Sequence, residues 1–407
     1  MSPSLKTFSS LKHPPFRFYL GMYLCQYAAM DMRTLAQPLL IYRLTGSVAL
    51  LGVVALVNAV PGILLPLVGG VIADRLPKKY TILLGQASAM FTSLLVALSL
   101  TFGLLSAERA GSWWIVMAAS FINYGAAGLV GPSRQAIIAE LVGTDHIMNA
   151  VSLRSLGYNV IHLGAPAIAG VVIDVFSFEV VYYTASGFSL LALVLTLFLP
   201  LTGTGEANHG NVLSQMKDGL KYVRGEGRIL FILAFTMAAA VLATPYSRLM
   251  PVFVDDILKV GATGMGVLLS ASAVGALISS LAVASLPSKR RGALMLISAA
   301  ALGLSLVGFA ISRSWYVSIA FVALVGMART ARATMSNTLL QSYTAAGYRG
   351  RVMSLYAMED GITSLGSFIA AMVAVVAGVT WTVAGFACAL VLLSLLAVFL
   401  PGIRKLE

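Results

Sequence analysis

Residues 49–79 read ALLGVVALVNAVPGILLPLVGGVIADRLPKK. No charged side chain occurs before Asp74, and a basic turn follows it. About 20 mostly apolar residues in a helix cover the ~30 Å hydrocarbon layer of a bilayer, and a helix satisfies its own backbone hydrogen bonds. The stretch therefore predicts a membrane-spanning helix that ends in a charged turn at the membrane surface.

Eleven more stretches of this kind lie along the 407 residues. The composition is 59% hydrophobic and 10% charged, with a mean hydropathy of +0.91, which excludes an ordinary soluble domain. We therefore predict an all-α integral membrane protein with twelve transmembrane helices. The predicted spans are 18–43, 49–73, 80–105, 112–133, 150–173, 178–200, 229–254, 263–286, 292–312, 315–338, 352–377 and 379–400.

We attribute the net charge of +12 to the orientation of the chain in the membrane rather than to nucleic-acid binding. The basic residues are dispersed between the spans, and no aromatic-rich polar surface accompanies them. Most of the 27 Lys and Arg fall on one side if the N-terminus is cytoplasmic, as the positive-inside rule requires. We expect a multi-pass protein of the cell membrane, monomeric within the lipid bilayer, with both termini cytoplasmic.

One polar stretch, residues 201–228, divides the chain into two nearly equal parts. Apolar residues recur within it at helical spacing, which predicts a cytoplasmic linker containing an amphipathic helix. The segment beginning at Asn149 matches the segment beginning at Arg351, 202 residues later. We therefore expect two pseudo-symmetric six-helix bundles, residues 1–200 and 229–407, with small-molecule cargo bound near the midplane between them.

The turn at residues 70–79 resembles the signature loop of the major facilitator superfamily, with Pro77 where glycine is usual. The resemblance implies the major facilitator fold and a loop that latches the cytoplasmic side shut. The alternative is a charged turn that only fixes topology. The gate candidates are Gly70, Asp74, Arg75, Lys78 and Lys79, with Arg134 and Arg351 as their partners.

The fifth span resembles the glycine-proline motif of drug and metabolite antiporters in that superfamily. Its small residues and proline are Gly157, Gly164, Pro166 and Gly170, and general helix packing is the alternative explanation. Residues 42–47, 131–134 and 348–354 resemble the enterobactin-exporter and macrolide-efflux branch. These resemblances imply an antiporter for an organic compound.

Carboxylates inside the spans are candidates for proton coupling, because charge is costly in lipid. They are Asp31, Glu359 and Asp360. Asp31 and Arg33 lie two residues apart on a helix, so they cannot face one another and need different partners. A fixed interhelical ion pair is the alternative for Asp31, and His162 is interpreted as a packing residue.

Mixed amide, phenol and guanidinium groups on the first, fourth and seventh spans suit an amphiphilic or anionic cargo. For each of them, an ordinary interhelical hydrogen bond is the alternative. Arg329 and Arg332 lie nearer the inner end of the tenth span. The cargo-site candidates are Gln26, Tyr27, Arg33, Gln37, Asn123, Tyr124, Tyr246 and Arg248.

We therefore predict a secondary transporter, a proton-coupled exporter that works by alternating access. A lipid or lysolipid flippase and a non-transporting receptor or scaffold are the alternatives. An enzyme is not expected, because the sequence has no metal-ligand cluster, no Ser-His-Asp arrangement among its four histidines and no phosphate-binding loop. No cofactor or metal is expected, and energy must come from an ion gradient.

Overall fold

The computed structural model describes residues 9–143, 146–201, 212–285 and 290–399. The side chains of residues 66–75, 212–217 and 346 lie outside the described set. Every regular element within the described ranges is helical. The chain forms two compact units, residues 1–40 with 64–208, and residues 41–63 with 209–407.

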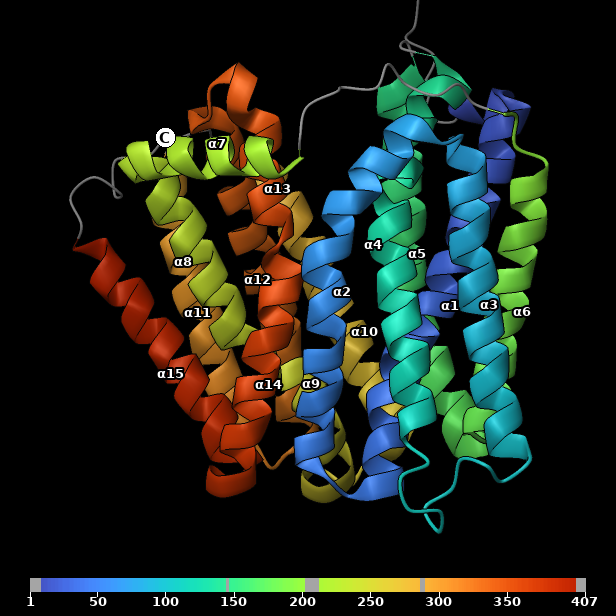
Figure 1. Cartoon of the computed structure of the whole chain (residues 1–407). Coiled ribbons are helices and arrows are strands. Elements are labelled where there is room, and N and C mark those ends of the chain that lie inside the picture. Colours follow the sequence, from blue (N-terminus) through green and yellow to red (C-terminus); the bar gives the residue numbers. More distant parts are fainter. Residues whose placement is uncertain (1–8, 144–145, 202–211, 286–289, 400–407) are drawn as a thin grey trace, which may run out of the picture. The chain divides into compact units, whose positions relative to one another are not determined.

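The first unit is built from long helices in which α3 packs between α4 and α6 (Figure 1). Two helices run from one unit into the other, since the end of α1 and the start of α2 belong to the second unit. The expected division into bundles 1–200 and 229–407 remains a prediction. The elements are η1 (Ser9–Lys12), α1 (Pro14–Thr45), α2 (Val48–Arg75), α3 (Lys78–Thr101), α4 (Trp114–Val142), α5 (Ile147–Val175) and α6 (Phe178–Leu197).

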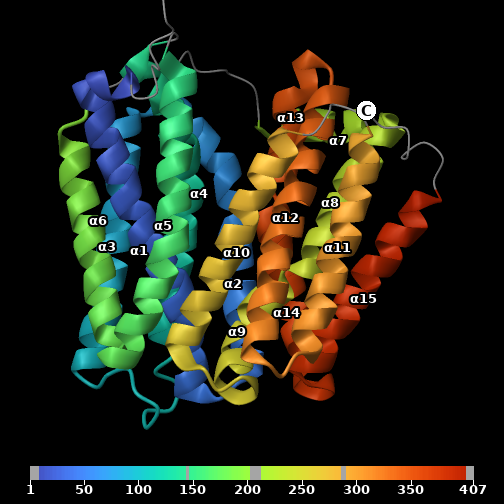
Figure 2. The ribbon, with the colours of Figure 1, turned by 180° about the vertical axis from the view of Figure 1, so that it is seen from behind.

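The second unit has α12 packed between α10 and α11, with α15 on the other side of α11 (Figure 2). Its seventh span is broken into α8, α9 and a π-helical turn, and its eleventh into α13 and α14. The elements are α7 (Val212–Gly225), α8 (Gly227–Ala243), α9 (Pro245–Val252), η3 (Phe253–Ile257), α10 (Gly261–Ala284), α11 (Arg291–Ile311), α12 (Trp315–Tyr343), η4 (Ala346–Tyr348), α13 (Arg349–Ala357), α14 (Glu359–Ala377) and α15 (Val379–Val398).

The amphipathic helix predicted in the linker is α7, which lies across the end of α8 and contacts α13 (Figure 1). Tyr222 of α7 stacks on Tyr348, with ring centroids 4.1 Å apart and planes 5° from parallel. Asp218 of α7 lies 3.9 Å from Arg351 of α13. The linker helix is thus docked on the second unit by specific side chains.

Eleven helical segments among the described residues are long and apolar enough to cross a membrane. The twelfth predicted span is α1, which has 32 residues but is more polar than the others. Its length suffices for a bilayer at 1.5 Å per residue. Its polarity comes from ionisable side chains such as Asp31 and Arg33, which the next subsection places.

The two halves of the chain repeat the same helix pattern. Helices α1, α2 and α3 begin at Pro14, Val48 and Lys78, each 213 residues before the starts of α8, α10 and α11. Helices α4 and α12 both have 29 residues, and α6 and α15 both have 20. The pattern supports the internal repeat that the sequence match predicts.

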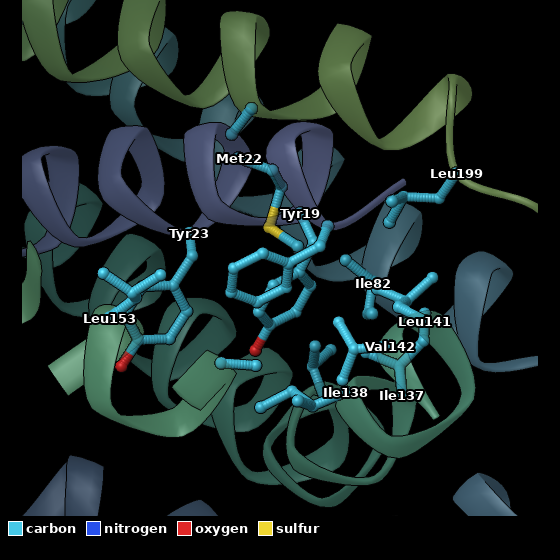
Figure 3. Close-up of a cluster of buried hydrophobic side chains, with 14 residues drawn as sticks. Tyr19, Met22, Tyr23, Ile82, Ile137, Ile138, Leu141, Val142, Leu153 and Leu199 are labelled. Carbon is cyan, nitrogen blue, oxygen red and sulfur yellow. The ribbon is translucent and has the colours of Figure 1, made fainter. Parts of the chain in front are cut away.

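A cluster of buried side chains joins α1 to α3, α4 and α5 in the first unit (Figure 3). Figure 3 shows the rings of Tyr19 and Tyr23 extending from α1 toward the side where Ile138 of α4 and Leu153 of α5 lie. The Tyr19 hydroxyl donates a hydrogen bond to the Arg134 carbonyl oxygen at 3.0 Å. This packing fixes the face of α1 that carries the candidate site.

Candidate functional site

One face of α1 carries four functional side chains at intervals of four residues: Tyr19, Tyr23, Tyr27 and Asp31. A spacing of four keeps side chains on the same face of a helix. The ring centroids of Tyr19 and Tyr23 are 6.0 Å apart, and those of Tyr23 and Tyr27 are 4.4 Å apart. The rings therefore form a continuous aromatic column that ends at a carboxylate.

Helix α5 carries a matching column of Arg154, Tyr158 and His162, again four residues apart. The Arg154 guanidinium carbon lies 5.4 Å from the Tyr23 ring centroid, and Tyr158 meets Tyr27 edge-on at 5.0 Å. Each partner lies 131 residues after its counterpart, so α1 and α5 run parallel in one register. We call these seven residues, four on α1 and three on α5, the α1–α5 column.

A glycine permits this close register. A Cβ at Gly157 would overlap the Leu24 side chain of α1, whereas nothing lies within 4 Å of a Cβ at Gly164. Helix α5 runs without interruption through Pro166, which is buried. Of the glycine-proline motif, Gly157 is therefore the position at which a small residue brings α5 against α1.

Asp31 is 5% exposed, and its Oδ2 lies 3.1 Å from Nδ1 of His162. The His162 ring also stacks on Tyr158 at 5.3 Å and keeps 44% of its side chain exposed. A carboxylate with a neutral imidazole carries one negative charge, and one added proton makes the pair neutral. The pair thus joins a buried carboxylate to an imidazole that remains partly exposed.

Arg33 turns away from Asp31, as their spacing predicts. Its Nη1 donates to Ser93 Oγ at 2.8 Å and to the Ala89 carbonyl oxygen at 3.2 Å, both on α3. Asp31 and Arg33 therefore bind side chains on different helices, Asp31 on α5 and Arg33 on α3.

Two cargo-site candidates of the first unit form interhelical hydrogen bonds. Gln37 Nε2 donates to Ser120 Oγ at 2.8 Å, and Asn123 Nδ2 donates to Thr92 Oγ1 at 2.6 Å. Tyr124 is half-buried on the same helix as Asn123. Gln26 differs from these, since its buried Oε1 accepts no hydrogen bond.

In the second unit, Arg332 of α12 binds Glu359 at the start of α14. Arg332 Nη2 lies 3.0 Å from Glu359 Oε1, and the exposed fractions of the two side chains are 4% and 18%. Arg332 Nη1 also donates to the Thr236 carbonyl oxygen of α8 at 3.4 Å. The structure thus pairs Glu359 with a cation on a different helix.

Asp360, next to Glu359, is exposed. The charges that act on it are those of Glu359, Arg329 and Arg248. Tyr246, predicted to contact cargo, is 4% exposed and meets Phe309 edge-on at 6.2 Å. The charged candidates of this unit therefore lie near one another, while Tyr246 is packed in the helix core.

The described gate candidates bind nearby helix ends. Lys78 Nζ lies 2.6 Å from Glu140 Oε1, and Lys79 Nζ donates to the carbonyl oxygens of Leu197 and Leu199 at 2.7 Å each. Arg351 approaches Asp218 of α7. The Gly70, Asp74 and Arg75 side chains lie outside the described residues, so the cytoplasmic latch stays a prediction.

The opposite end of α1 carries a second charged contact, within the second unit. Arg43 binds Asp255 through two hydrogen bonds of 2.9 and 3.1 Å, and the Tyr42 hydroxyl donates to Asp256 Oδ2 at 2.5 Å. Both aspartates lie in the π-helical turn η3. We call these four residues the Arg43–Asp255 cluster.

Sequence reasoning missed His162, Tyr158, Arg154, Tyr19 and Tyr23 as members of the site. The signal that was available is the spacing of four residues in both segments, which places each set on one helix face. No group of three or more His, Cys, Asp and Glu side chains in the described ranges is arranged to hold a metal ion.

Known proteins resemble this chain along most of its length. The enterobactin exporter EntS of Shigella boydii serotype 4 (strain Sb227) is 27% identical over 86% of this chain and 82% of its own. The staphyloferrin A transporter of Staphylococcus aureus (strain NCTC 8325 / PS 47) is 23% identical over 82% of each chain. The multidrug efflux pump Tap of Mycolicibacterium fortuitum is 25% identical over 98% of each chain.

Solved structures support the fold. The crystal structure of the nucleoside transporter NupG matches with a TM-score of 0.79 and 15% identity, over 95% of this chain and 99% of that chain. The family described as "Transmembrane secretion effector" matches residues 5–407. The helix pattern, the internal repeat and this match agree, and the chain belongs to the transmembrane secretion effector family of major facilitator transporters.

Proposed function

We propose that this protein exports an amphiphilic or anionic organic compound in exchange for protons, by alternating access, and that the Asp31–His162 pair carries the proton. The observation that carries the proposal is a buried carboxylate whose partner is another titratable group, 3.1 Å away. Leaving one net charge buried between helices is costly, and a single proton removes that charge. Proton binding therefore changes the net charge that is held between α1 and α5.

The charge balance favours Asp31 over the other two carboxylate candidates. Glu359 is paired with an arginine, which stays protonated, so this pair is already neutral. A proton on Glu359 would leave Arg332 buried with an uncompensated charge. Asp360 is exposed, and the charges of Glu359, Arg329 and Arg248 all act on it, so it is not a buried carboxylate with a single titratable partner.

The relatives support the choice of cargo class. Their names refer to enterobactin, staphyloferrin A and several drugs, all of which are organic compounds. The α1–α5 column offers aromatic faces and cations at one end and the proton-binding pair at the other. Such a surface suits a compound with both ring systems and charge.

The test begins by finding a cargo. We would measure the thermal stability of the purified protein with siderophores, macrolides, lysolipids and metabolites, because a ligand stabilises the state that it binds. Stabilisation by lysolipids alone would favour the flippase alternative. Cargo-dependent proton flux and uphill accumulation would then be measured in proteoliposomes with the stabilising compound.

The variants are Asp31→Asn and, as the matched control in the other unit, Asp360→Asn. We expect Asp31→Asn to lose proton flux and uphill accumulation while keeping downhill exchange, since neutralisation removes the proton site without removing the helix packing. Asp360→Asn should keep proton flux. The coupling role of Asp31 is wrong if Asp31→Asn accumulates cargo and moves protons like the wild type.

A further inference from the structure

Two arginines of the first unit, Arg134 on α4 and Arg154 on α5, lie against the aromatic rings of α1. Among the described residues no ion pair joins either guanidinium group to a carboxylate. Arg134 is 9% exposed, and its Nη1 is buried without a hydrogen bond. The Nε of Arg154 is likewise buried and unpaired.

The two cations lie close together along the column. The Arg134 guanidinium carbon is 5.9 Å from the Tyr27 ring centroid, and that of Arg154 is 5.4 Å from the Tyr23 centroid. Those two rings are neighbours, with centroids 4.4 Å apart, and both cations act on the Tyr19 hydroxyl. Two positive charges thus share one short stretch of helix surface.

Cation–π contacts do not offset the cost of this arrangement. Such a contact is weak compared with the cost of removing an unpaired cation from water. The buried N–H groups without a hydrogen bond add a further desolvation cost. An anion bound between the guanidinium groups would satisfy the charges and the free donors together.

We propose that Arg134 and Arg154, with the ring of Tyr27, form a binding subsite for an aromatic carboxylate. A guanidinium group presents parallel N–H donors that match the two oxygens of a carboxylate. The Tyr27 ring beside them is only partly buried and offers a surface on which an aromatic group of the ligand stacks. A small inorganic anion would bind to the two guanidinium groups but would not stack on an aromatic ring.

The subsite lies on the same column as the proton-binding pair. Tyr27 is four residues from Asp31, and Tyr158 is four residues from His162. A carboxylate held by the arginines therefore sits one helix turn or more from Asp31. The interpretation of this subsite as a cargo site rests on the proposed function. Cargo would enter it from the side predicted to be cytoplasmic.

The experiment measures binding rather than transport, so that its result is independent of proton coupling. Isothermal titration of the full-length protein in detergent uses 2-naphthoate as the probe, with neutral 2-naphthamide and inorganic sulfate as comparison ligands. The variants are Arg134→Gln and Arg154→Gln. The matched control is Arg228→Gln, because Arg228 makes a similar contact with Tyr343, 5.7 Å from its ring centroid, in the second unit.

We expect 2-naphthoate to bind more tightly than 2-naphthamide or sulfate. Each of Arg134→Gln and Arg154→Gln should weaken naphthoate binding about tenfold, equivalent to about 1.4 kcal/mol, while Arg228→Gln binds like the wild type. Arg134→Lys keeps the charge but loses the paired donors, so it should bind with intermediate affinity even if Arg134→Gln fails to fold.

Three results would overturn the subsite. The first is equal binding of naphthoate by the wild type and both glutamine variants, and the second is equal binding of naphthamide and naphthoate. The third is displacement of naphthoate by dihexanoylphosphatidylglycerol but not by dihexanoylphosphatidylcholine, which would assign the arginines to a lipid headgroup. If Asp31→Asn loses proton flux but binds naphthoate like the wild type, the result supports both the subsite and the coupling role of Asp31.

Discussion

Replacing Glu359 with glutamine should destabilise the second unit, because it leaves the Arg332 charge buried without a partner. Breaking a fully buried ion pair by removing one partner costs about 3–5 kcal/mol. The Arg332 side chain is only 4% exposed, but Glu359 is 18% exposed, so water reaches the site and lowers the penalty. The Thr236 carbonyl still accepts one hydrogen bond from Arg332. We therefore expect a loss of about 2–3 kcal/mol.

The assay is reversible unfolding of the detergent-solubilised protein with increasing sodium dodecyl sulfate, followed by circular dichroism. Asp360→Asn is the neighbouring control, and because that carboxylate is exposed it should change the unfolding free energy by less than about 1 kcal/mol. The double variant Arg332→Met with Glu359→Met should recover most of the loss, since replacing both partners removes the buried charges. Equal unfolding of Glu359→Gln and the wild type would refute this account of the pair.

Two further predictions concern α5 and the far end of α1. Alanine favours the helix over glycine by up to about 1 kcal/mol, so Gly164→Ala should stabilise the protein. Gly157→Ala should stabilise it less, or destabilise it, because the new Cβ would overlap the Leu24 side chain. Equal changes in the unfolding free energy of the two variants would contradict the close α1–α5 contact. Arg43→Gln should cost less than about 1 kcal/mol, as expected for a partly exposed ion pair. It should nevertheless speed maleimide labelling of a Ser47→Cys probe in a background lacking Cys25 and Cys388, with exposed Arg313→Gln as the control. Unchanged labelling would mean that the Arg43–Asp255 cluster does not hold this end of α1.

The helices themselves could be read from the sequence. Apolar length and the need to satisfy backbone hydrogen bonds in lipid are local properties. They predicted twelve spans and the amphipathic helix α7, and eleven segments among the described residues are long and apolar enough to cross a membrane. The internal match also predicted the repeat, because related segments keep related helix lengths. Even the separation of Asp31 from Arg33 followed from helix geometry alone.

The partners of the ionisable side chains could not be read in the same way. His162 was interpreted as a packing residue, yet it lies against Asp31, and Glu359 finds its cation on a helix that begins 44 residues earlier in the chain, at Trp315. Gln37 and Asn123 were assigned to the cargo site, and the structure gives them hydrogen-bond partners on neighbouring helices.

The physical reason is that the pairing of side chains depends on the register and rotation of one helix against another. A hydropathy pattern determines that a segment spans the bilayer, but it leaves the segment free to slide or turn against its neighbours. Contacts such as Gly157 against Leu24 set that register, and a shift of one residue would rotate each side chain of α5 by about 100°. The sequence determined which helices exist, and tertiary packing determined that Arg154, Tyr158 and His162 meet Tyr23, Tyr27 and Asp31.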